Sequence, residues 1–133
     1  MTPAEVLTRA ADLIEAAPKL AKGVYNAYAI ELDEHGRESG VHVPWDEYDN
    51  AGPLCYCAIG AMARAVGKPA VMAHLDPDYL SAATSLARTL GAPNGTMDII
   101  EGAIFLWNDA PGRTKDEVVQ ALRTAAGLAQ VSS

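Results

Sequence analysis

The sequence has few aromatic residues, few cysteines and no long apolar run. Aromatic residues make up 6% of the 133 residues while Ala is the most frequent residue, which favours closely packed helices over a thick β-sandwich. No apolar run approaches the ~18 residues of a membrane-spanning helix. The N-terminus has no basic start followed by an apolar stretch, so we do not expect a secretory signal. These absences predict one compact domain, residues 1–133, in the cytoplasm and without a membrane partner.

Motifs for common cofactor and metal sites are also missing. Cys55 and Cys57 are too few for a disulfide framework, and their spacing is shorter than that of structural zinc ligands. Residues 46–50 are rich in carboxylates but lack the alternation and the distant Glu of a calcium-binding loop. We find no glycine-rich phosphate-binding motif and no Gly-x-Ser-x-Gly nucleophile motif. The sequence therefore predicts no metal and no cofactor.

Positive charge is scarce, and negative charge is concentrated in one segment. The net charge is −7, and residues 31–49 hold seven carboxylates against Arg37 alone. Direct nucleic-acid binding is not expected, because such affinity comes largely from neutralising phosphates. The segment is either a solvated hairpin or an acidic surface that approaches a basic partner or mimics a nucleic acid.

Five segments have the apolar spacing and the end signals of amphipathic helices. Two of them begin with a capping box, formed by residues 2–5 and 114–117, in which side chains and backbone NH groups bond reciprocally. Gly60 within the second helix costs about 1 kcal/mol relative to Ala, so we expect a neighbouring backbone to lie close to it. The predicted helices cover residues 3–17, 53–66, 77–90, 99–107 and 115–129.

Residues 24–32 change to the alternating pattern of a half-buried strand. Residues 33–37 can turn the chain, and residues 41–43 can return as a second strand until Pro44. An isolated hairpin is marginally stable, so this one should pack on the helices. The predicted fold is α+β and predominantly α, with about five packed helices and one β-hairpin at about residues 24–43.

Cys55 and Cys57 are both at or near a predicted helix N-terminus, and Cys57 is the candidate nucleophile. Partial positive charge at such a helix end can lower a thiol pKa. A thiol-dependent enzyme would take His42 or His74 as its base, and Asn108 or Asp109 could orient that base. Alternatively, Cys57 is a small buried residue on a tightly packed helix face, as is common for Cys. The second interpretation is favoured, and no catalytic residue is assigned.

Trp107, Asn108, Asp109 and Arg113 surround a predicted turn between the last two helices. Residues 111–112, Pro-Gly, fit the central pair of a type II turn, and Arg113 can pair with Asp109. Trp and Arg are also residue types that dominate the hot spots of protein interfaces. Each residue nevertheless has a turn or capping role, so structure is favoured over function. The four remain the candidate interaction residues.

Three segments carry a likeness to a known family. They are AEVLTRAADLIE in the first helix, CAIGAMARAVG at residues 57–67 and WNDAPGRTKDEVVQALRTAA at residues 107–126. Together they resemble a family of small uncharacterised proteins from actinobacteria and their phages, a domain of unknown function (DUF6197-like). The resemblance implies an intracellular accessory protein, with a phage gene as one source. It implies no catalytic residue.

A non-enzymatic protein-interaction module is the function that the sequence favours. We expect its partner to be a host protein or a second copy of the chain, and homo-oligomers remain open. The alternative function is a thiol-dependent enzyme that uses Cys57 with a His base. A third hypothesis is a small-ligand site between the hairpin and the helices.

Overall fold

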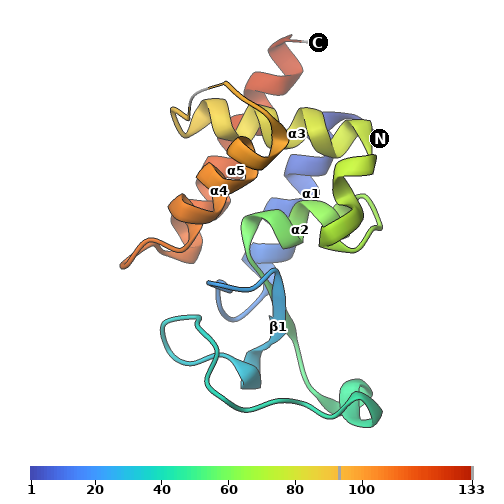
Figure 1. The fold of residues 1–133 in the computed structure, drawn as a ribbon, viewed down its shortest axis with the longest axis vertical. Helices are drawn as coiled ribbons and strands as arrows, with labels where there is room; N and C mark the ends of the chain where they lie inside the picture. Colours follow the sequence, from blue (N-terminus) through green and yellow to red (C-terminus); the bar gives the residue numbers. More distant parts are fainter. Residues whose placement is uncertain (93, 133) are drawn as a thin grey trace.

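Five α-helices and a two-stranded ribbon are the main elements of residues 1–92 and 94–132, which the computed structural model describes. The helices form one body, and the ribbon and the chain between its strands project from one end of that body (Figure 1). The predicted class, α+β and predominantly α, is confirmed. The helices are α1 (Pro3–Ala16), α2 (Ala58–Ala65), α3 (Pro77–Thr89), α4 (Met97–Asn108) and α5 (Lys115–Ser132), and the strands are β1 (Asn26–Tyr28) and β2 (Leu54–Tyr56).

Both predicted capping boxes are formed. The Thr2 hydroxyl accepts from the Glu5 NH at 3.1 Å, and the Glu5 carboxylate accepts from the Thr2 NH at the same distance. Thr114 and Glu117 repeat the arrangement at the start of α5. Because these bonds join residues only three apart, the sequence alone is enough to locate the starts of both helices.

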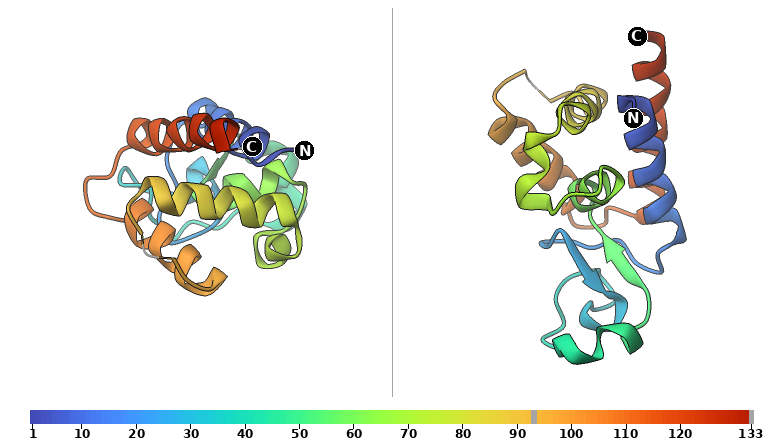
Figure 2. Two further views of the ribbon diagram at one scale, coloured as in Figure 1. Left: turned by 90° about the horizontal axis from the view of Figure 1, so that it is seen from above. Right: turned by 90° about the vertical axis from the view of Figure 1, so that its right-hand side faces the viewer.

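The first and last helices lie side by side, as the two views of Figure 2 show. Ion pairs join them, with the Arg123 guanidinium 3.0 Å from the Asp12 carboxylate and 3.3 Å from that of Glu15. Beneath these exposed pairs, the apolar stripes of α1 and α5 meet those of α2 and α3. The fully buried side chains of this core include Val6, Leu7, Ile14, Ile59, Met62, Tyr79, Leu86, Ile104, Val118 and Leu122.

Gly60 sits at a close approach of two backbone segments. A Cβ at this position would lie 1.9 Å from the carbonyl oxygen of Tyr25. The Cys57 NH donates to the same carbonyl at 3.0 Å, which holds the lead-in to β1 across the start of α2. The expected neighbouring backbone at Gly60 is therefore confirmed.

The predicted return strand at residues 41–43 is wrong. β1 pairs antiparallel with β2, in the register Asn26↔Tyr56, Ala27↔Cys55 and Tyr28↔Leu54. The predicted turn at 33–37 does form, with Asp33 NH donating to the Arg37 carbonyl at 2.7 Å and a single bridge joining Leu32 and Glu38. The strand forms at β2 because its side chains reach the core, whereas Val41 is 48% exposed. Helix α2 consequently begins at Ala58 rather than near residue 53.

We call residues 29–53, between the two strands, the arm. The arm contains two short 3₁₀ helices, η1 (Ala29–Glu31) and η2 (Trp45–Asn50), and a third, η3 (Ala70–Leu75), lies between α2 and α3. The arm lies at the lower end of the molecule in Figure 1, away from α3 and the chain termini. Among residues 1–92 and 94–132, no helix combines the length and the apolar character needed to cross a bilayer.

Candidate functional site

The structure seals both cysteines in the core. Cys57 is the N-cap residue of α2, where its Sγ accepts from the Gly60 NH at 3.4 Å. Its exposed fraction is zero, and burial raises the pKa of the thiol to about 12. Cys55 is also buried, and burial raises its pKa. At neutral pH both thiols are protonated, and Cys57 has no access to a substrate.

The two candidate bases lie on other parts of the surface. His42 belongs to the arm, its side chain is 76% exposed, and its Nδ1 lies 4.0 Å from a Glu31 carboxylate oxygen. His74 is exposed on η3 of the helical body. Among the described residues, neither histidine hydrogen-bonds Cys57, whose sulfur accepts from the Gly60 NH. The thiol-dependent alternative therefore lacks both an exposed nucleophile and an adjacent base. Within residues 1–92 and 94–132, no three His, Cys, Asp or Glu side chains gather as metal ligands.

Asn108 is a buried connector between three segments. Its Oδ1 accepts from the Ala58 NH at 3.0 Å, and its Nδ2 donates to the Ala21 carbonyl at 3.0 Å and to the Asp109 carboxylate at 2.9 Å. The exposed fraction of Asn108 is zero. Asn108 is the last residue of α4, and its side chain thus accepts from a backbone NH at the start of α2 that has no partner within the helix. The sequence predicts a turn or capping role for Asn108, but its backbone partners lie at the start of α2 and after α1 rather than in the connection between α4 and α5. A fully buried side chain offers no surface to a partner.

Arg113 binds across the turn that follows α4. Its Nε donates to the Trp107 carbonyl at 3.0 Å, and its guanidinium lies over the Trp107 ring, 4.1 Å from the centroid. The guanidinium also pairs with Glu117 at 3.0 Å, so the predicted pair with Asp109 is wrong. The type II turn is formed, with the Arg113 NH donating to the Ala110 carbonyl at 3.0 Å and φ of +79° at Gly112. A partner role for the half-buried Trp107 and Arg113 stays a prediction.

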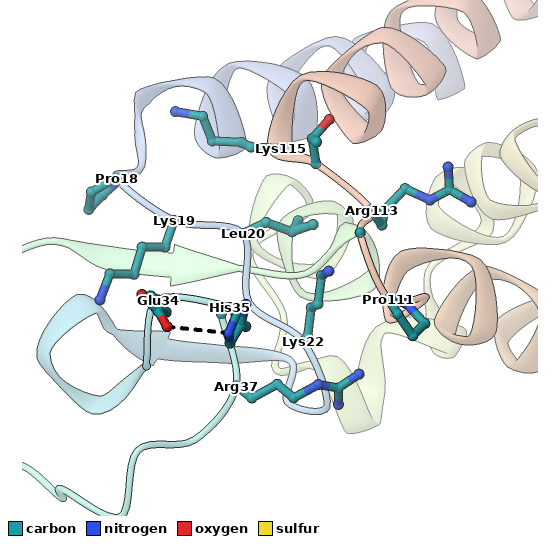
Figure 3. Close-up of a pocket in the computed structure, with 13 residues that line it drawn as sticks. Pro18, Lys19, Leu20, Lys22, Glu34, His35, Arg37, Pro111, Arg113 and Lys115 are labelled. Carbon is teal, nitrogen blue, oxygen red and sulfur yellow. Dashed lines mark ion pairs between the residues drawn. The ribbon is translucent and has the colours of Figure 1, made fainter.

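A cleft of about 680 Å³ opens where the arm meets the helical body. Its walls come from three connections: residues 18–22 after α1, the arm turn 34–37, and residues 111–115 between α4 and α5 (Figure 3). Five of the ten Lys and Arg residues in the chain line it. These five residues, Lys19, Lys22, Arg37, Arg113 and Lys115, are called the cleft cations below. Glu34 is the one carboxylate among the lining residues.

The cleft cations hold the three connections together through backbone carbonyls. Lys19 donates to the carbonyls of residues 29 and 32, and Lys115 to those of residues 15 and 17, at distances between 2.9 and 3.2 Å. Lys22 donates to the Ala110 carbonyl at 3.1 Å, and Arg37 to the Asp109 carbonyl at 2.8 Å. These bonds fix the arm turn and the chain after α1 against the end of α4.

Lys22 is the most buried of these cations, with an exposed fraction of 7%. Burial lowers the pKa of its ammonium group, and the positive charge of Arg37 lowers it further. The backbone around it leaves little space, since a Cβ on Gly36 would lie 2.0 Å from the Leu20 carbonyl oxygen. Tight packing of the arm turn on residues 20–22 thus places Lys22 and Arg37 together.

Of the cleft cations, the sequence singled out Arg113 as a candidate site residue and missed the other four. They are scattered over residues 19–115, and only the fold brings them together. One feature of the sequence could have indicated the cluster: Arg37 is the single cation in the acidic segment, residues 31–49. In the structure its guanidinium donates to the Asp109 carbonyl rather than to a neighbouring carboxylate. The third hypothesis, a small-ligand site between the hairpin and the helices, placed a site in this region without naming its residues.

The arm presents a second unusual surface. Trp45 is 83% exposed, although a large apolar side chain is normally buried at least in part. Tyr48, one turn later, is 49% exposed, and its ring packs against that of Tyr28 with centroids 5.3 Å apart. Asp46, Glu47 and Asp49 surround the two aromatic residues in η2. The result is an aromatic tip with an acidic border.

Comparison with known proteins identifies a family for this chain. No curated protein and no solved structure matches the chain. A family model described as a family of unknown function (DUF6197) matches residues 1–128, which include the arm, the cleft and the three segments quoted above. Because the match covers nearly the whole chain, the protein belongs to the DUF6197 family of unknown function.

Proposed function

We propose that this protein is a non-enzymatic protein-interaction module inside the cell, and that it docks on its partner through the arm. The observation that carries the proposal is the exposure of Trp45, 83% of which is open to water at the tip of a projecting segment. Trp and Tyr are the side chains that most often anchor protein interfaces, because they bury a large area with few rotatable bonds.

The geometry of the arm suits insertion into a partner. In the right-hand view of Figure 2, the 3₁₀ helix that carries Trp45 lies at the end of the arm, below the helical body. The Tyr28–Tyr48 ring contact connects η2 to β1, and β1 is in turn paired with β2. The arm is therefore held at its base while its tip remains accessible. Little ordering is needed on binding, which lowers the entropic cost of association.

Charge around the tip favours a basic partner. Asp46, Glu47 and Asp49 border the exposed aromatic residues, and all three side chains are exposed. A partner with an apolar pocket and a basic border would complement this surface and would be steered toward it. A second copy of the chain is less suited, because two molecules of net charge −7 repel each other. We therefore propose a different protein with a basic surface as the partner.

Comparative affinity purification tests this proposal. The baits are the wild type, Trp45→Ala and, as a matched control, Leu106→Ala, which removes an apolar side chain that is 79% exposed on α4. We expect one partner that the wild type and Leu106→Ala retain and that Trp45→Ala loses. Retention should fall as salt is raised, since screening weakens the charge complementarity.

Binding that does not depend on Trp45, or a partner that is a second copy of the chain, would overturn the proposal. Binding is independent of Trp45 if the Trp45→Ala bait retains the partner as well as the wild type does. The absence of a partner for any bait would also overturn it. The partner is a second copy if light scattering shows a homodimer that Trp45→Ala converts to a monomer. Circular dichroism of each variant shows whether the helices are intact before the comparison is made.

A further inference from the structure

We propose that the cleft between the arm and the helical body binds the phosphate group of a small organic phosphate, with Lys22 and Arg37 as its direct ligands. This inference concerns a different surface from Trp45 and does not rest on the proposed function. It starts from an uneven distribution of charge: the chain is acidic overall, yet half of its Lys and Arg residues line this one cleft.

Carboxylates neutralise this cluster only in part. Among the described residues, Arg113 is the only cleft cation within 4.0 Å of a carboxylate, which belongs to Glu117. Lys19, Lys22, Arg37 and Lys115 have backbone carbonyls as their partners instead. The lining carboxylate of Glu34 lies 3.4 Å from the ring of His35. The carboxylates of Asp109 and Glu117 offset part of the positive charge around Lys22. Like charges that are only partly neutralised disfavour the folded state, and a bound anion reduces that penalty.

Lys22 and Arg37 keep donors for such an anion. An ammonium group has three NH donors and a guanidinium has five, yet within the described part of the chain each of these two side chains gives one hydrogen bond, to the carbonyls of residues 110 and 109 respectively. Figure 3 shows Lys22 between Leu20 and the turn at residues 111–113, with Arg37 extending toward the same side. A buried ammonium with one carbonyl partner gains most from a second, charged acceptor.

The volume and the lining residues of the cleft indicate which class of molecule carries the phosphate group. A volume of about 680 Å³ is in the range of small-molecule sites and is much larger than inorganic phosphate requires. Pro18, Leu20 and Pro111 supply apolar wall beside the cations. Guanidinium forks match phosphate oxygens in two-point contacts, and Lys adds a point charge. A phosphate monoester with a compact organic part meets all three features.

Isothermal titration calorimetry with inorganic pyrophosphate tests the site at constant ionic strength. We expect saturable 1:1 binding to the wild type. Arg37→Gln should weaken it about tenfold or more, as expected for a lost charge-assisted hydrogen bond. The matched control is Arg88→Gln, which removes the same charge from an exposed position on α3 and should bind as the wild type does. Citrate, a polycarboxylate probe, should bind at least tenfold more weakly than pyrophosphate.

A second variant and a measurement on the wild type distinguish loss of the phosphate site from misfolding of a variant. Lys22→Met retains the length of a buried side chain and should also weaken pyrophosphate binding at least tenfold. In the wild type, pyrophosphate should shift the backbone amide signals of residues 20–22, 35–37 and 112–115 more than those of η2. No saturable heat, an equal loss in Arg88→Gln, or amide shifts centred elsewhere would overturn the site. Equal affinity for citrate would overturn the assignment to phosphate.

Discussion

Asn108, at the end of α4, binds the first residue of α2: its Oδ1 accepts from the Ala58 NH at 3.0 Å, across 50 residues of sequence. Removing the carboxamide leaves that NH and the Ala21 carbonyl buried without their partner. We expect Asn108→Ala to lower the free energy of unfolding by about 2–4 kcal/mol in urea titrations. Asn50→Ala, at the exposed end of η2, should change it by less than about 0.5 kcal/mol. Similar losses in both variants would contradict this role for Asn108.

Gly60→Ala should destabilise the protein, although Ala is the better helix former. The new methyl group would lie 1.9 Å from the Tyr25 carbonyl oxygen, so α2 and the lead-in to β1 must separate. We expect a loss of several kcal/mol in thermal or urea unfolding, by analogy with other overpacked sites. Gly102→Ala in α4 meets no atom within 4 Å and should stabilise by about 0.5–1 kcal/mol. A stable Gly60→Ala variant would disprove the close approach.

The Cys57 thiol should make stability fall at alkaline pH. Its pKa is about 12 in the folded protein against 9.0 for an ordinary thiol. Above pH 9 the unfolded chain loses a proton that the folded chain keeps, so the free energy of unfolding decreases by up to about 1.4 kcal/mol per pH unit. Urea midpoints from pH 8 to 10.5 measure this slope. Cys57→Ala should have a shallower slope, and equal slopes would show that the thiol is not buried.

Both cysteines should react slowly with a thiol reagent in the native state. Each is buried, and burial raises both pKa values, so the reactive thiolate is scarce and inaccessible. We expect labelling by a chromogenic disulfide to be at least a hundredfold slower in buffer than in denaturant, because labelling must wait for opening of the core. Fast labelling of one thiol in the native protein would contradict this prediction and would support the alternative of a thiol-dependent enzyme.

The fluorescence of Trp45 should be quenched differently by a cation and by an anion. In a Trp107→Phe variant, fluorescence reports Trp45, which is 83% exposed and bordered by Asp46, Glu47 and Asp49. Caesium should quench it more efficiently than iodide after correction for their intrinsic efficiencies, because the carboxylates attract cations and repel anions. High salt should reduce the difference. Equal quenching in low salt would show that the acidic border does not act on the tip.

Local signals in the sequence predicted the parts of the fold that depend on neighbouring residues. Capping boxes, such as that of Thr2 with Glu5, join residues three apart, and Gly112 forms its turn within four residues. A close neighbour of Gly60 could be predicted, because a glycine within a helix is unfavourable unless another segment packs against it. That the neighbour is the Tyr25 carbonyl could not be predicted.

Features that depend on tertiary packing could not be predicted in this way. A strand of three residues such as Leu54–Tyr56 has too little pattern to be recognised, and it forms because the core buries Cys55 and Tyr56. The partners of Asn108 and the neighbours of Lys22 come from distant segments. The cleft is likewise built from three connections that have no common motif.

The bonds between Lys115 and the end of α1 have a consequence for synthesis on the ribosome. Lys115 donates to the carbonyls of Glu15 and Ala17, which are about a hundred residues earlier in the chain. The nascent first helix therefore cannot complete its native contacts until α5 has been translated and has left the exit tunnel. Until then the part of its surface that packs on α5 is available to molecular chaperones.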